Sequence, residues 1–243
     1  RRCALSLAIA CDGSDEAGRE RVLDELDAVF GALKAAGQEA PEWPNDQPLR
    51  RPVEARQLPY DRWKAHIRQI QTAIADGDFL KIVATRRCDL TLESPVDDVD
   101  VLGRLMSEAK CTHFAFRRAT SSFVGASPEM LFYKVGQALQ TQALAGTLRR
   151  TGTGQTTYDG QCQSLLGSQK DRSEHGFVVE AIRKALDPLC SDIAIARAPE
   201  IIALRNILHI NTPFEARLRP GTHVTDLIAA LHPTPAVGGV PGP

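Results

Sequence analysis

Apolar residues along the chain recur in two patterns, one with the spacing of helices and one with the alternation of strands. Helical spacing predicts helices at five places: residues 16–36, 60–76, 97–108, a segment that begins near Lys170, and a last segment capped by Thr222. Alternating or β-rich runs predict strands at residues 5–9, 79–92, 113–117, 200–204 and 207–218. The pattern predicts a strand-rich chain that helices interrupt.

Two segments lack either periodicity. Residues 38–58 hold four prolines and predict a linker or a long surface loop. Residues 151–168 are small and polar and predict a flexible loop, whose GTGQT sequence lacks the lysine of a phosphate-binding loop. We therefore assign a strand, a helix and the proline-rich linker to residues 1–58, and the main core to residues 59–243 of the same domain.

The sequence of residues 123–150 predicts a β-hairpin that carries candidate functional residues. Glu129 is an isolated carboxylate there, and the stretch leads into a predicted loop, Ala145-Gly146-Thr147, which is followed by Arg149 and Arg150. An acid beside a Gly-Thr loop and two arginines could engage a small anionic substrate. The simpler interpretation of the arginines, that they face solvent, stays open.

Composition narrows the class of protein. The 243 residues carry a formal charge of −1 and are 43% apolar, which is ample for a core and gives no basic excess for nucleic acid or an anionic membrane. The six cysteines are scattered without a CxxC pair, which predicts reduced thiols in the cytoplasm. The opening RRCALSLAIAC faintly resembles a lipoprotein signal, but a strand explains it better, and no run is long enough to cross a bilayer.

Four further side chains have a structural and a functional interpretation. Lys81 lies in a β-rich run, where it either reaches water or is buried so that its pKa falls and the neutral amine can act as a base. Asp171 and Glu174 lie three apart in a first helical turn, where they either cap the helix or present carboxylates to Mg²⁺. His209 lies opposite the apolar face of its strand and carries little weight alone.

Six short motifs connect these residues. In chain order they are KIVATR (81–86), FVGASPEML (123–131), ALAGT (143–147), KDRSEH (170–175), LRNILHINT (204–212) and LHPTPAVGGVP (231–241). Their order resembles that of the chorismate-utilising enzymes, and within them the isochorismate synthases. The resemblance implies an α+β fold of large, mostly antiparallel sheets with outer helices and an active site between them, and a catalytic core in residues 59–243.

The resemblance also assigns roles. Lys81 looks like the base that activates water for attack on C2 of chorismate, and Glu129 like the acid that protonates the departing C4 hydroxyl. The loop Ala145-Gly146-Thr147 and His209 would bind the substrate. Glu174, with Asp171 beside it, looks like a magnesium ligand, so Mg²⁺ is the expected cofactor and chorismate the expected small-molecule partner of a monomer that binds neither nucleic acid nor membrane.

The branch of the family follows from two positions. Amine-transferring relatives, the anthranilate and aminodeoxychorismate synthases, are not expected to carry a lysine at position 81, and Ala145 differs from the lysine of aminodeoxychorismate synthases. Salicylate synthase remains the nearer alternative. The missing initial Met and the absence of the family's C-terminal segment imply part of a longer protein, so an inactive fragment or pseudo-enzyme is a further alternative. The downstream pathway, whether siderophore, menaquinone or salicylate, stays open.

Overall fold

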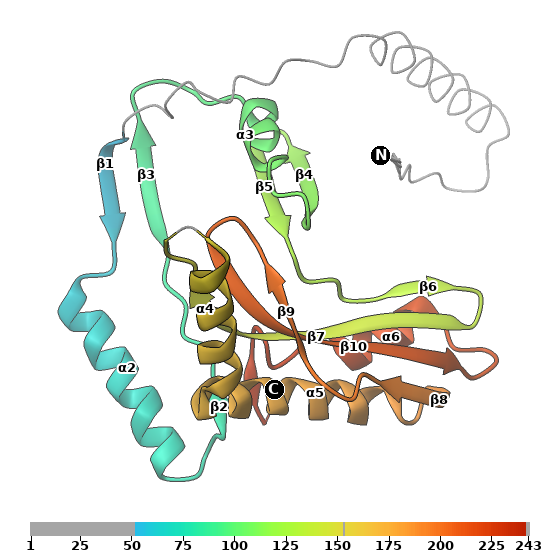
Figure 1. Ribbon diagram of the computed structural model, residues 1–243. Coiled ribbons are helices and arrows are strands. Elements are labelled where there is room, and N and C mark those ends of the chain that lie inside the picture. Colours follow the sequence, from blue (N-terminus) through green and yellow to red (C-terminus); the bar gives the residue numbers. More distant parts are fainter. Residues whose placement is uncertain (1–51, 153, 242–243) are drawn as a thin grey trace, which may run out of the picture. The chain divides into compact units, whose positions relative to one another are not determined.

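Two long antiparallel strands form the centre of the main sheet, β7 (Ala138–Arg149) and β10 (Ile207–Leu218). The computed structural model describes residues 52–152 and 154–241, which belong to a compact unit of residues 46–243. Figure 1 shows the two strands side by side in a sheet of order β6-β7-β10-β8, in which β9 also pairs with β10. The shorter strands are β6 (Tyr133–Val135), β8 (Cys190–Ile195) and β9 (Glu200–Ala203). The predicted strand at 5–9, the helix at 16–36 and residues 38–51 of the linker lie outside the described residues.

Helix α5 (Gln169–Leu186) packs on this sheet, and the hydrophobic core lies between them (Figure 1). The predicted apolar face is confirmed, because Val178, Ile182 and Leu186 are fully buried at helical spacing against Phe214 and other sheet residues. Helix α6 (Val224–Leu231) adds two more buried leucines to the same cluster. Its preceding residue is His223, whose backbone N–H donates to the Asp226 carboxylate at 2.8 Å, so the predicted Thr222 cap is wrong by one position.

The predicted loop at residues 151–168 is largely a helix. Helix α4 (Gln155–Gly167) packs Leu165 into a second buried cluster with Leu208 and Ile210 of β10, and Tyr158 and Cys162 contribute from the same helix face. These positions are four and three residues apart, which is helical spacing. The prediction failed because abundant glycine, serine and threonine hid a face of only a few apolar residues.

The stretch 123–150 is divided between two sheets rather than forming one hairpin. Strand β5 (Ser121–Ser127) pairs with β4 (Thr112–Arg118) in a separate two-stranded sheet beside α3 (Asp98–Leu105). The hairpin itself is β6–β7, which turns at Gly136 with φ +58°. Glu129 therefore lies in the segment that connects the two sheets, not within the hairpin.

The remaining elements include both confirmations and corrections. Helix α2 (Tyr60–Ala75) forms as predicted, and Gly77 follows it with φ +84°. The predicted run 79–92 contains two strands, β2 (Lys81–Ile82) and β3 (Cys88–Leu92). Part of the predicted linker is a strand, β1 (Pro52–Gln57), which pairs with β3. Its side chains are exposed, so the strand depends on backbone hydrogen bonds to β3 and leaves no apolar pattern in the sequence. In the described part of the chain, no helix is long and apolar enough to cross a membrane.

Candidate functional site

Lys81 is buried where two short strands meet. It lies on β2, which pairs with β11 (Gly239–Val240), and only 8% of its surface is exposed. Its Nζ donates a hydrogen bond to the carbonyl oxygen of Pro235 and lies 4.0 Å from Oε1 of Glu174. Burial lowers the pKa of Lys81 below its ordinary value, and the Glu174 carboxylate opposes this only in part. Lys81 is therefore buried rather than solvent-facing.

Glu129 lines a largely apolar cavity of about 180 Å³. The other lining residues come from its own segment and from the segment after α6: Ser127, Leu131, His232, Thr234 and Val237. The Thr234 hydroxyl donates to Oε1 of Glu129 at 3.4 Å. Burial raises the pKa of Glu129 above its ordinary value, and the Thr234 hydrogen bond opposes the rise.

One segment links the two groups. Residues 232–240, which we name the strap, carry both Thr234, which contacts Glu129, and Pro235, which contacts Lys81. The strap turns where the Thr234 carbonyl accepts the N–H groups of Val237 and Gly238 at 3.1 and 3.0 Å. It then pairs with the strand that holds Lys81, so adjacent strap residues bring together an amine and a carboxyl group 48 positions apart in the sequence.

The segment Ala145-Gly146-Thr147 lies within β7 and is not a loop. Ala145 is opposite Ile210 and Thr147 is opposite His209, so Gly146 is an extra residue, a β-bulge, with φ +81°. The Thr147 hydroxyl and Nδ1 of His209 are 2.9 Å apart. Burial lowers the pKa of His209, although a hydrogen bond to the Gly146 backbone opposes this, so a neutral imidazole is favoured.

His175 is a buried polar residue that the sequence interpretation left out of the site. Its Nδ1 is 3.2 Å from the carbonyl oxygen of Ala145, and its Nε2 is 2.7 Å from the Thr212 hydroxyl. Because a carbonyl only accepts, Nδ1 carries the proton and Nε2 accepts from the hydroxyl. The histidine thus ties α5 to both central strands beside the bulge. Its signal in the sequence is a histidine at helical spacing from buried Val178 and Ile182.

Asp171 and Glu174 take different roles in the structure. Ser168 caps α5 and donates its hydroxyl to the Asp171 carboxylate, while the Asp171 N–H donates to the same hydroxyl at 3.3 Å. This is a capping interaction, and Asp171 also lies against the bulge, since a Cβ at Gly146 would be 3.3 Å from its Cβ. Glu174 instead faces Lys81.

The two carboxylates suit magnesium only as a small set of protein ligands. Within residues 52–152 and 154–241, no group of three or more His, Cys, Asp or Glu side chains is arranged around a common point. Magnesium, however, usually takes one or two protein carboxylates and completes its shell with water and substrate oxygens. The half-buried Glu174 fits that requirement, with Asp171 one turn earlier already bonded to Ser168.

Comparison with known proteins places this geometry in a family. A family model described as chorismate binding enzyme matches residues 1–243. The salicylate biosynthesis isochorismate synthase of Pseudomonas aeruginosa is 42% identical over 186 residues, which are 74% of this chain and 38% of that protein. The isochorismate synthase MenF of Bacillus subtilis is 31% identical over 222 residues, which are 90% of this chain and 46% of that protein.

Solved structures agree. The menaquinone-specific isochorismate synthase MenF of Escherichia coli superposes with a TM-score of 0.72 at 26% identity, over 80% of this chain and 46% of that one. Anthranilate synthase component I of Streptococcus pneumoniae superposes with a TM-score of 0.72 at 19% identity, over 92% and 48%, a likeness of fold alone. The predicted α+β fold with antiparallel sheets is confirmed, and the chain spans about half the length of these relatives. The chain belongs to the family of chorismate-binding enzymes.

Proposed function

We propose that the protein has isochorismate synthase activity: it converts chorismate to isochorismate by adding water at C2 and releasing the C4 hydroxyl, with magnesium as cofactor. The observation that carries the proposal is the strap, which joins a buried amine and a half-buried carboxyl group through neighbouring residues. Burial penalises the charged form of each group, so the pKa of Lys81 is lowered and the pKa of Glu129 is raised. These are the directions that a neutral base and a protonated acid need.

The proposed proton transfers use these two residues. A neutral Lys81 keeps one N–H on the Pro235 carbonyl, and its lone pair takes a proton from the water that attacks C2. A protonated Glu129 gives its proton to the leaving C4 oxygen. One water is consumed and one is released, which leaves Lys81 protonated and Glu129 ionised. Lys81 then loses its proton to solvent and Glu129 takes one from solvent, so atoms and charge balance over one turnover.

In this proposal, the residues at the Gly146 bulge and Glu174 bind the substrate and the metal. The exposed Thr147 hydroxyl, held against His209 beside the Gly146 bulge, is the group that would contact a substrate carboxylate. Glu174 is the residue that would hold magnesium, with Asp171 behind it. When bound, the metal supplies positive charge that neutralises and orients a substrate carboxylate.

Three alternatives are distinguishable. A salicylate synthase would eliminate pyruvate after the same first step, and an anthranilate or aminodeoxychorismate synthase component would use ammonia instead of a lysine-activated water. An inactive member of the family would bind without turnover. The buried Lys81 favours lysine-activated water over ammonia as the nucleophile. We favour isochorismate over salicylate because two similar relatives carry the name isochorismate synthase. We further propose that the protein acts as a monomer in the cytoplasm.

Product identification tests the proposal. The 243-residue chain is incubated with chorismate and Mg²⁺, and the products are separated by chromatography. Isochorismate is the expected product. Salicylate with pyruvate, anthranilate formed with added ammonium, or no product at all would each contradict the proposal and support the corresponding alternative.

A further inference from the structure

Thr234 stands at the point where the strap contacts the acid, and two hydrogen bonds orient its hydroxyl group. Oγ1 accepts the backbone N–H of Ala236 at 3.3 Å, so its own hydrogen is left for Oε1 of Glu129. Only 7% of Thr234 is exposed, so little water competes for either bond. The Ala236 bond thereby fixes the side chain in the rotation that points the hydroxyl hydrogen at the carboxyl group.

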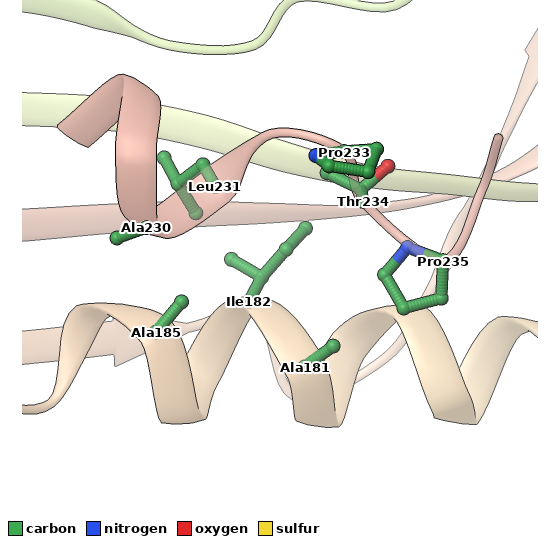
Figure 2. Close-up of a pocket in the computed structure, with 8 residues that line it drawn as sticks. All are labelled: Ala181, Ile182, Ala185, Ala230, Leu231, Pro233, Thr234 and Pro235. Atoms are coloured by element: carbon green, nitrogen blue, oxygen red, sulfur yellow. The ribbon is translucent and has the colours of Figure 1, made fainter. Parts of the chain in front are cut away.

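The backbone under Thr234 is fixed as well. Figure 2 shows Pro233, Thr234 and Pro235 facing Ala181, Ile182 and Ala185 of α5. The cavity that these residues line has a volume of about 40 Å³. The strap therefore packs over the face of α5 with only a small, partly open space between them. Within the strap, the bonds from Val237 and Gly238 to the Thr234 carbonyl fix the turn that follows Thr234.

We propose that Thr234 is a positioning residue for Glu129, whose hydroxyl engages one carboxyl oxygen and leaves the other to carry the proton into the cavity. The effect of this contact on catalysis rests on the proposed function, whereas the contact between Thr234 and Glu129 does not. A carboxylic acid carries one proton, and an oxygen that already accepts a hydrogen bond is the weaker site for it. The proton therefore lies on Oε2, the oxygen without the Thr234 bond.

The contact has a measurable electrostatic effect. Burial raises the pKa of Glu129, and the Thr234 hydroxyl lowers it because it stabilises the carboxylate. The titratable side chain that lines the same cavity is His232, from the start of the strap, and Ser127, Leu131 and Val237 bring no charge. Removal of the hydroxyl at constant shape should therefore raise the pKa of Glu129 further, whereas a loss of structure would expose the carboxyl group and lower it.

Direct titration of Glu129 tests this without substrate. The whole chain is labelled with ¹³C at the glutamate carboxyl carbon, and Glu129→Gln identifies the signal. Thr234→Val should move the titration midpoint of Glu129 to higher pH, and Thr234→Ser should leave it in place. Each variant should give the same shift when His232→Gln is also present. An unchanged or lowered midpoint in Thr234→Val overturns the proposal. If the valine variant fails to fold, Thr234→Ala provides the same comparison.

Activity supplies the second readout. In the chorismate assay, Thr234→Val should lower kcat about fivefold with KM unchanged, the effect of one ordinary hydrogen bond acting on the transition state, and Thr234→Ser should restore most of it. Equal kcat for Thr234→Val and the wild type overturns the positioning role. The proposed function fails separately, when the wild type forms no isochorismate, and the titration then still decides whether Thr234 holds Glu129.

Discussion

The Gly146 bulge permits a quantitative prediction, because both its backbone conformation and its surroundings disfavour a side chain. With φ at +81°, a residue with a Cβ pays about 1–2 kcal/mol for the left-handed conformation. The added Cβ would also lie 3.0 Å from Cδ1 of Ile210 and 3.3 Å from Cβ of Asp171, both in the packed layer between β10 and α5. Overpacking of this kind costs about 1–3 kcal/mol. Gly146→Ala should therefore destabilise the protein by about 3 kcal/mol.

Gly136 provides a matched control in the β6–β7 turn. It has a positive φ of +58°, but no atom lies within 4 Å of an added Cβ. Gly136→Ala should thus show the conformational cost alone, about 1–2 kcal/mol. The entropy that alanine removes from the unfolded chain is the same in both variants and cancels from the comparison.

Urea unfolding followed by circular dichroism measures the difference. We expect Gly146→Ala to lose more stability than Gly136→Ala by about 1–3 kcal/mol, which corresponds to a melting temperature lower by several degrees. Chorismate turnover should fall only in Gly146→Ala, since the bulge also holds Thr147 against His209. Equal losses of stability in the two variants would refute the packing argument for Gly146.

Three further predictions concern the site residues. Lys81→Ala should reduce turnover at least a hundredfold, as for a lost general base, while circular dichroism shows a folded chain; full activity in this variant would rule out Lys81 as the base. Glu129→Gln should abolish turnover yet melt at a higher temperature than the wild type near pH 8. Because its pKa is raised in the folded protein, Glu129 stabilises the fold below its ordinary pKa and loses this contribution as pH rises through the raised value. The two proteins should therefore melt alike near pH 4. A variant that melts at a lower temperature than the wild type at both pH values contradicts the burial of this carboxyl group. His175→Phe should destabilise the protein by about 1–3 kcal/mol in urea, because the Ala145 carbonyl and the Thr212 hydroxyl lose their buried partner, and a neutral result would show that water replaces the ring.

The sequence predicted the elements whose burial follows a regular period. Helix α5 was recognisable because Val178, Ile182 and Leu186 repeat at helical spacing, and β10 because Leu208, Ile210 and Phe214 alternate. Helix α4 was missed because a few apolar residues are enough when the helix covers only the end of a sheet. A glycine such as Gly146 signals a special backbone conformation in the sequence, but not whether that conformation occurs in a loop or in a bulge.

The candidate site was predictable only as a set of separate residues. Lys81 and Glu129 were singled out from motifs, but their link runs through a backbone carbonyl of Pro235 and the hydroxyl of Thr234. A carbonyl exists at every position, so nothing in a sequence marks the one that a lysine contacts. The division between Asp171, which joins a helix cap, and Glu174, which faces Lys81, likewise depends on which way each carboxylate points from the same helix.

The origin of the new hydroxyl oxygen tests the central claim most directly, since the proposed reaction adds solvent water at C2 rather than moving the C4 hydroxyl. The protein is incubated with chorismate and Mg²⁺ in ¹⁸O-labelled water, and the isochorismate is analysed by mass spectrometry. We predict one ¹⁸O atom per molecule of product in the wild type, and product formation at least a hundredfold slower in Lys81→Ala. Isochorismate without the label, or labelled isochorismate formed equally well without Lys81, would contradict the account.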